Sequence, residues 1–116
     1  MNNRELGKKY EVKATDYLRK KGYKIICHNF NCSIGEIDII AEEGGYLCFI
    51  EVKYRSSTRY GFPSEAVDKR KRYKIIKVAQ YYMLNNNYSE NTPCRFDVVE
   101  ILRNHINIIK DAFYGV

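Results

Sequence analysis

The sequence predicts an α/β fold: a central mixed sheet of about five strands flanked by helices, in the order α-β-β-β-α-β-β. Two patterns of helical period, over residues 4–21 and 63–85, indicate the helices. Five short apolar runs indicate the strands, three before the second helix and two after it. The 116 residues contain no repeat and no linker-like tract, so we expect a single domain over residues 1–116.

The first helix is indicated by apolar side chains that recur at helical spacing from Leu6 through Ala14 to Leu18. Gly22 follows and is a typical helix end. Residues 23–30, YKIICHNF, are rich in apolar and β-branched side chains and are expected to form the first strand. The chain therefore enters the sheet directly after its first helix.

A tight hairpin is predicted within residues 35–55, GEIDIIAEEGGYLCFIEVKYR. Gly44 and Gly45 separate two apolar runs, and both can adopt the positive φ that a two-residue hairpin turn requires. With these glycines as the loop, Glu43 pairs with Tyr46. The turn therefore determines which residues of the two strands face each other.

This register gathers charged side chains on one face of the hairpin. Asp38 lies opposite Glu51, and Glu36 lies opposite Lys53, so three acids and one lysine share a face. Directly opposed side chains have Cβ atoms about 5 Å apart. A sheet covered by helices on both sides also needs apolar residues on the other face. The residues expected there are Ile37, Ile39, Ile50 and Val52.

The second half of the chain supplies one helix and two strands. The helix is expected to begin at Pro63-Ser64 and to end at about Asn85, where three consecutive asparagines follow the apolar pattern. Residues 95–101, RFDVVEI, and 106–109 are expected to be strands, separated by the turn-like pair Arg103-Asn104. These two strands complete the sheet.

The facing acids of the hairpin favour a metal site. Two like charges this close repel each other unless a cation lies between them. Mg²⁺ and Mn²⁺ accept carboxylate oxygens, so Asp38 and Glu51 are candidate ligands, and the backbone carbonyl of Val52 is a candidate third ligand. Lys53 shares their face and is placed to orient a water or to neutralise charge at phosphorus. The alternative is a cross-strand ladder of ion pairs with Lys53 and Arg55.

Three more charged residues interrupt apolar patterns. Glu11 lies at the margin of the apolar face of the first helix, so it either faces the sheet or remains partly solvated. Lys71 interrupts an apolar row of the second helix, so it either lies beneath or beside the sheet or extends its ammonium group to solvent as a snorkelling lysine. Asp97 is embedded in a strand, where an ion pair with Arg95 or with an adjacent basic group would compensate its charge.

The net charge of +6 favours a polyanionic partner, because clustered Lys and Arg bind phosphates without reading sequence. No apolar run approaches the ~20 residues of a membrane span, so we expect no membrane association. The first residues show no apolar signal region, so we expect a cytoplasmic protein. The residues expected to contact nucleic acid are Lys8, Lys9, Arg55, Lys69, Arg70, Lys71 and Arg72.

These motifs resemble the YraN family, small bacterial proteins placed among restriction-endonuclease-like, Holliday-junction-resolvase-like folds. The most specific part is GEIDIIA (residues 35–41) followed by FIEVKYRSS (residues 49–57). One departure is Asn29-Phe30-Asn31, where relatives commonly show Asn-Trp-Arg. The resemblance also includes Gly7, Glu11, Gly61, Glu65-Ala66-Val67, Lys71, Ala79, residues 95–99 (RFDVV) and Asp111-Ala112-Phe113.

The resemblance implies that Asp38 and Glu51 are metal ligands, that Lys53 is the catalytic lysine, and that Glu11 is an additional ligand or water-positioning acid. The sequence thus favours a Mg²⁺- or Mn²⁺-dependent endonuclease that hydrolyses DNA phosphodiester bonds. So short a chain has little room for a sequence-reading module, so we expect it to be directed to branched or single-stranded DNA.

Symmetric cutting of both strands of a junction needs two active sites, which would make the protein a homodimer. Two alternatives remain from other classes. The first is a non-catalytic nucleic-acid-binding protein that retains the nuclease fold. The second is a structural or partner-binding protein whose acids form an internal ion-pair network.

Overall fold

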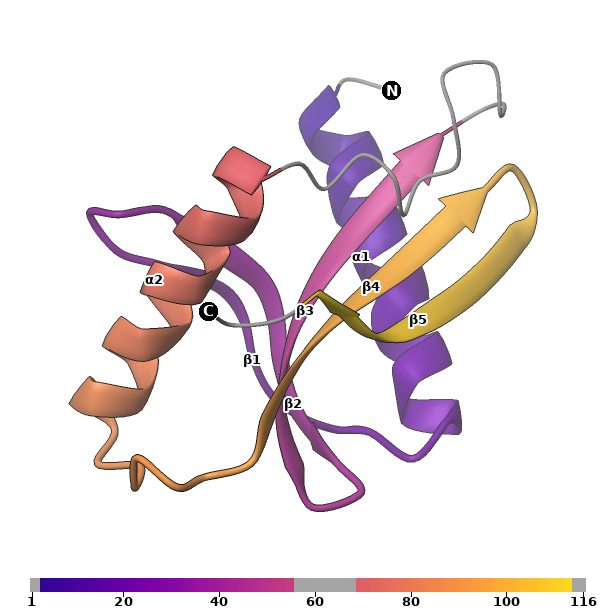
Figure 1. Ribbon diagram of the computed structural model, residues 1–116. Helices are drawn as coiled ribbons and strands as arrows, with labels where there is room; N and C mark the ends of the chain where they lie inside the picture. Colours follow the sequence, from indigo (N-terminus) through magenta and orange to yellow (C-terminus); the bar gives the residue numbers. More distant parts are fainter. Residues whose placement is uncertain (1–2, 56–68, 114–116) are drawn as a thin grey trace.

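The elements follow the predicted order in the computed structural model, which describes residues 3–55 and 69–113 (Figure 1). The α/β class and the number of strands are confirmed, whereas the predicted start of the second helix at residue 63 lies outside the described residues. The elements are α1 (Asn3–Lys20), β1 (Lys24–Asn31), β2 (Glu36–Glu43), β3 (Tyr46–Arg55), α2 (Lys69–Asn85), β4 (Cys94–Leu102) and β5 (His105–Phe113).

One five-stranded sheet in the order β1-β2-β3-β4-β5 forms the centre of the molecule. Neighbouring strands are antiparallel except β3 and β4, which are parallel. Parallel neighbours need a crossover connection, and α2 lies within it. Helix α1 covers one face of the sheet and α2 the other (Figure 1). Neither helix of the described ranges has the length and apolar content needed to cross a bilayer.

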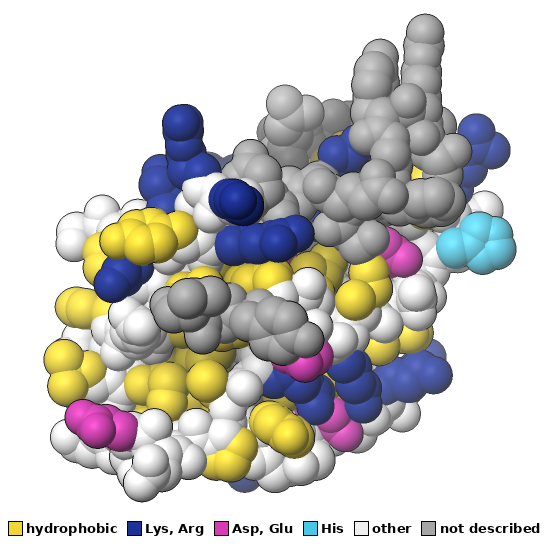
Figure 2. Space-filling view, in the orientation of Figure 1, with side chains coloured by type: hydrophobic (Ala, Val, Ile, Leu, Met, Phe, Trp, Pro, Cys, Tyr) yellow, Lys and Arg dark blue, Asp and Glu magenta, His cyan; other side chains and the backbone are white. Residues whose placement is uncertain are grey.

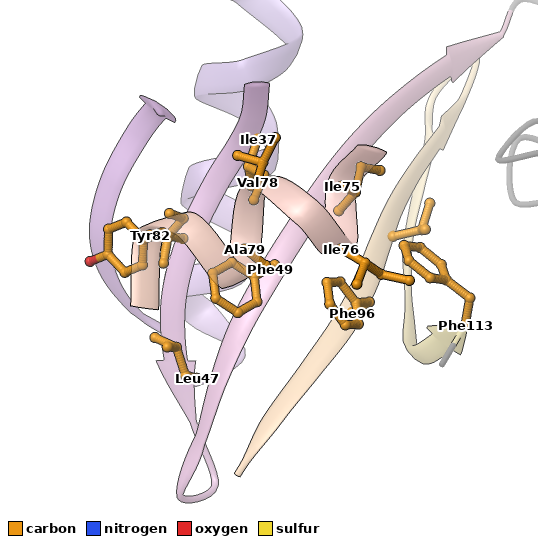
Figure 3. Close-up of a cluster of buried hydrophobic side chains, with 12 residues drawn as sticks. Ile37, Leu47, Phe49, Ile75, Ile76, Val78, Ala79, Tyr82, Phe96 and Phe113 are labelled. Carbon is orange, nitrogen blue, oxygen red and sulfur yellow. The ribbon is translucent and has the colours of Figure 1, made fainter. Parts of the chain in front are cut away.

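Two apolar clusters, one on each face, hold the helices to the sheet. On the face of α2, Phe49 stacks on Phe96 at 5.6 Å between ring centroids and meets the edge of Tyr82 at 6.1 Å. Figure 3 shows the α2 side chains directed at these strands. On the opposite face, Ala14 and Leu18 of α1 are fully buried. They pack against Tyr23, Ile39, Ala41, Cys48, Ile50, Val99 and Ile101.

The hairpin between β2 and β3 has the predicted turn and register. Gly44 and Gly45 have φ of 59° and 84°, a left-handed conformation that other residues adopt at a cost. Glu43 pairs with Tyr46, and the ladder continues to the pair of Ile39 with Ile50. The turn chemistry alone was therefore sufficient to set the register.

The ladder ends three pairs earlier than predicted, because β2 and β3 separate beyond Ile39 and Ile50 (Figure 1). From there β2 remains paired with β1, and β3 remains paired with β4. The expected pairs of Asp38 with Glu51 and of Glu36 with Lys53 lie beyond the ladder. We call this opening between the two strands the fork.

One residue changes face at the fork. Ile37 was expected on the same face as Ile39, but it packs in the α2 cluster, whereas Ile39 packs against α1. Its partner Phe30 on β1 also packs against the α2 cluster. The neighbouring Asn29 has φ of 51°, which interrupts the alternation of β1. A strict period of two therefore fails beside Asp38.

A buried ion-pair network stabilises the opposite end of the sheet, near the hairpin turn. The fully buried Asp97 accepts hydrogen bonds from Arg95 Nε at 2.9 Å and from the Tyr23 hydroxyl at 2.9 Å. Arg95 Nη2 also donates to Glu43 at 2.7 Å, and Lys110 donates to the same carboxylate at 3.1 Å. The predicted pairing of Asp97 with Arg95 is confirmed.

Candidate active site

Asp38 lies at the fork and takes over a strand hydrogen bond there. The backbone N–H of Val52 donates to Asp38 Oδ2 at 2.8 Å. In a continued ladder, a backbone carbonyl of the facing strand would serve as the acceptor. The Asp38 carboxylate therefore accepts the hydrogen bond of a β3 backbone N–H group. It also lies close enough to Glu51 for the Glu51 charge to raise its pKa.

Glu51 is the most enclosed acid of the fork, with a side chain only 10% exposed, and two lysines face it. Lys53 Nζ lies 3.7 Å from Glu51 Oε1, and Lys71 Nζ of α2 lies 3.1 Å from the same oxygen. Among the ion pairs of residues 3–55 and 69–113, none includes Asp38. Both nearby lysines are thus within ion-pair distance of Glu51, while their charges act on Asp38 from farther away.

This arrangement raises the pKa of Asp38 to about 7, because the carboxyl group is buried and the Glu51 charge is close. The Val52 N–H opposes the rise, and Glu36 adds to it. Burial and the Glu51 charge therefore disfavour the ionised form of Asp38, and a bound cation would relieve this.

The two lysines at Glu51 affect each other. Burial lowers the pKa of Lys53, and the adjacent Lys71 lowers it further, against the pull of Glu51. Burial also disfavours the charge of Lys71, but the contact with Lys53 and the charge of Glu51 outweigh burial and raise its pKa. Lys71 is therefore the stronger cation, and Lys53 is the amine more ready to give up a proton.

Glu11 of α1 faces the sheet, as one of the two sequence alternatives proposed. Its carboxylate oxygens accept hydrogen bonds from Asn29 Nδ2 at 2.9 and 3.1 Å. A cleft of about 240 Å³ is lined by Glu11 together with Asp38 and Val52. Gly7, Tyr10 and Tyr54 complete its walls. Glu11 thus shares a solvent space with Asp38, and its role as ligand or water-positioning group remains a prediction.

Basic residues at the start of α2 lie next to the fork. Lys71 lines a groove of about 360 Å³ with Arg70 and Lys74 along one wall and Gly35 and Glu36 along the other. Figure 2 shows Lys and Arg side chains gathered over this end of α2. We call this space the basic groove. Its position beside Glu51 would bring a bound phosphate close to the carboxylates.

The other basic residues expected at nucleic acid are more scattered. Lys69 is exposed in the first turn of α2, whereas the Arg72 guanidinium lies 5.7 Å from the ring centre of Phe113. Lys8 and Lys9 are exposed on α1. Arg55 ends β3, and its carbonyl accepts a hydrogen bond from the Arg103 N–H at 3.2 Å. Their contacts with nucleic acid remain predictions.

Comparison with known proteins places this arrangement in a family. Residues 10–101 match the model of the uncharacterised protein family UPF0102. The chain belongs to this family. The UPF0102 protein of Lachnoclostridium phytofermentans is 49% identical over 99% of both chains. That of Clostridioides difficile is 50% identical over 97% of this chain and all of its own. The expected YraN resemblance is confirmed.

Two contacts of this UPF0102 chain were not anticipated from its sequence. Lys71 lies beside the sheet, as one of the two sequence alternatives proposed, but its ion pair with Glu51 was not foreseen. The interrupted apolar row was a signal of it, because a lysine held near the sheet needs a buried acid. Asn29 was not foreseen as the partner of Glu11, and only its φ of 51° makes this contact understandable.

The donor set fits a hard divalent cation that is bound by few protein ligands. Within the described parts of this UPF0102 chain, no group of three or more His, Cys, Asp or Glu side chains is placed to hold a metal. Mg²⁺ does not need such a cage, since it is usually bound by one or two carboxylates, waters and substrate phosphate. Asp38 and Glu51 supply two carboxylates, and the Val52 carbonyl remains the predicted third oxygen.

Asp38→Asn is expected to stabilise the metal-free protein at pH 8. Asp38 titrates near 3.8 when unfolded and near 7 when folded, so folding retains a proton that the unfolded chain loses. Wild-type stability should fall as pH rises from about 4 to 7 and level off above that. Asparagine does not ionise and so avoids this loss of stability. The variant's free energy of unfolding is expected to exceed that of wild type by roughly 1–3 kcal/mol at pH 8 and to differ little at pH 4.

Urea unfolding with EDTA at both pH values measures this gain. Glu42→Gln, at an exposed acid of the same strand, is the matched control and should change stability by less than about 0.5 kcal/mol. A wild type more stable than Asp38→Asn at pH 8 would show that Asp38 is well satisfied without a cation.

Proposed function

We propose that this protein is a divalent-metal-dependent endonuclease that hydrolyses DNA phosphodiester bonds, directed to branched or single-stranded DNA. The observation that carries the proposal is the fork: Asp38 and Glu51 lie together, and both nearby lysines are within ion-pair distance of Glu51 but not of Asp38. A purely structural ion-pair network would be expected to give both acids a cation.

The residues of the fork have distinct roles in this proposal. Asp38 and Glu51 hold Mg²⁺ or Mn²⁺, with Glu11 as an additional ligand or a water-positioning acid. When bound, the metal polarises the scissile phosphate and neutralises charge that develops on it. Lys53, 3.7 Å from Glu51, orients the attacking water and stabilises the developing charge.

The basic groove supplies the affinity for the nucleic-acid backbone. Its Arg70, Lys71 and Lys74 contact phosphates and carry no base readout, so the shape of the DNA directs binding. Cutting a four-way junction symmetrically would require a homodimer with two forks. The cytoplasmic location expected from the sequence is part of this proposal.

A second candidate is a non-catalytic nucleic-acid-binding protein that keeps the fold. One observation favours it: Lys53 and Lys71 already neutralise Glu51 without a metal. Such a protein would bind DNA or RNA with the salt dependence of phosphate contacts and would be indifferent to divalent cations.

The test is cleavage of linear, single-stranded and four-way-junction DNA with Mg²⁺, with Mn²⁺ and with EDTA. The proposal expects products only with a divalent cation, most from the branched or single-stranded forms, and none with Glu51→Gln. Binding to all three without cleavage favours the second candidate. Products formed equally in EDTA, or by Glu51→Gln, contradict the proposed site.

A further inference from the structure

Lys71 connects two parts of the site that are otherwise separate. Its Nζ lies 3.1 Å from Glu51 Oε1, closer than the 3.7 Å of Lys53. The same side chain lines the basic groove with Arg70 and Lys74. One ammonium group therefore lies within reach of a carboxylate of the fork and of any phosphate in the groove.

Glu51 and Lys71 differ in burial, so Lys71 can be replaced by another cation at Glu51. The Glu51 side chain is 10% exposed and needs a cation at all times, because a buried unpaired carboxylate is costly. The Lys71 side chain is 40% exposed and also lines the basic groove. Lys71 can thus move from Glu51 toward the groove when another cation takes its place and a phosphate accepts it.

We propose that Lys71 couples metal binding to nucleic-acid binding: it neutralises Glu51 in the unliganded protein and moves to a backbone phosphate when DNA enters the basic groove. This rests on the proposed function, in which Asp38 and Glu51 hold a divalent cation. A metal bound alone must displace Lys71 or accept a positive charge a few ångströms away. With DNA in the groove, that repulsion is removed.

The consequence is reciprocal. If DNA raises the affinity for the metal by some factor, the metal raises the affinity for DNA by the same factor. We expect that factor to be about 10, within the usual range for coupled sites. Lys71 is then a positioning residue, and its removal should increase affinity for metal alone while weakening the coupling.

Titration of Mn²⁺ by calorimetry, with and without a short single-stranded DNA that carries phosphorothioate linkages, tests this. Wild type is expected to bind Mn²⁺ weakly alone and about 10-fold more tightly with DNA. Lys71→Met is expected to bind Mn²⁺ alone about 10-fold more tightly than wild type and to gain little from DNA.

Lys77→Met is the matched control, since this lysine of the same helix lies 5.4 Å from the Tyr73 ring centre and not at Glu51. It should behave as wild type. Thermal melting without ligand checks that each variant folds, and Lys71→Gln provides a second substitution. The coupling is overturned if both Lys71 variants bind Mn²⁺ with wild-type affinity and DNA still raises that affinity as much as in wild type. This result leaves the proposed function intact. No Mn²⁺ binding by any variant, with or without DNA, overturns both.

Discussion

Lys53→Ala is expected to lower the rate of DNA cleavage by about 10²–10⁴ while DNA affinity and melting temperature change little. Lys53 lies on β3 two residues from Glu51, with its Nζ 3.7 Å from Glu51 Oε1. Burial and the adjacent Lys71 lower its pKa, so the amine is suited to proton transfer as well as to charge stabilisation. Both contributions act mainly in the transition state, which is why the rate should change more than binding.

Single-turnover cleavage with saturating protein measures this rate separately from binding. Lys24→Ala is a suitable control, because Lys24 is an exposed lysine beside the hairpin turn, at the other end of the sheet. It should retain the wild-type rate. If Lys53→Ala cleaves as fast as wild type, the activity belongs to another site or to a contaminating nuclease.

Asp97→Ala is expected to have the largest effect on stability, a loss of about 3–5 kcal/mol. The substitution leaves the buried Arg95 with Glu43 as its remaining acidic partner and the Tyr23 hydroxyl without an acceptor. The backbone N–H of Asp111, which donates to Asp97 Oδ1 at 2.9 Å, also loses its partner. Since Asp111 lies on β5, the end of that strand should loosen from the sheet.

Urea and thermal unfolding measure this loss, which should lower the melting temperature by the order of 10 °C or more. Asp16→Ala, an exposed acid on α1, should change stability by less than about 0.5 kcal/mol. An Asp97→Ala protein within about 1 kcal/mol of wild type would mean that water or other groups readily replace the carboxylate.

The fold and the hairpin register were predictable because local chemistry determines them. Gly44 and Gly45 require a turn with positive φ, and that turn places Ile39 opposite Ile50 wherever the hairpin lies in the molecule. The helix and strand patterns likewise depend on period alone. These features needed no knowledge of distant contacts.

The fork was not predictable, because a side chain replaces a backbone partner there. Hydrophobic alternation predicts a continuous ladder through Asp38, and nothing local indicates that its carboxylate accepts the Val52 N–H. The change of face at Ile37 has the same origin. The sequence therefore predicted that Asp38 and Glu51 lie close together, but not the separation of the two strands at that point.

The long-range ion pairs were only partly predictable. The pair of Asp97 with Arg95 is two residues apart on one strand, and alternation places both on one face. Lys71 reaches Glu51 from another element, and Glu43 reaches Arg95 across the sheet, so both contacts depend on tertiary packing. The hydrophobic period of a helix or strand can show that a charged residue is buried, but it does not show which residue forms the ion pair with it.

Binding of Mn²⁺ to the fork is the most direct test, because the proposed function and the role of Lys71 both depend on it. Electron paramagnetic resonance of free Mn²⁺ during titration, with and without single-stranded DNA, measures the affinity and number of sites. We expect one Mn²⁺ per chain, displaced by Mg²⁺, with affinity lowered about 10-fold or more by Asp38→Asn and by Glu51→Gln but unchanged by Glu42→Gln. Binding that both substitutions leave unchanged, or no binding even with DNA, would contradict a metal site at Asp38 and Glu51.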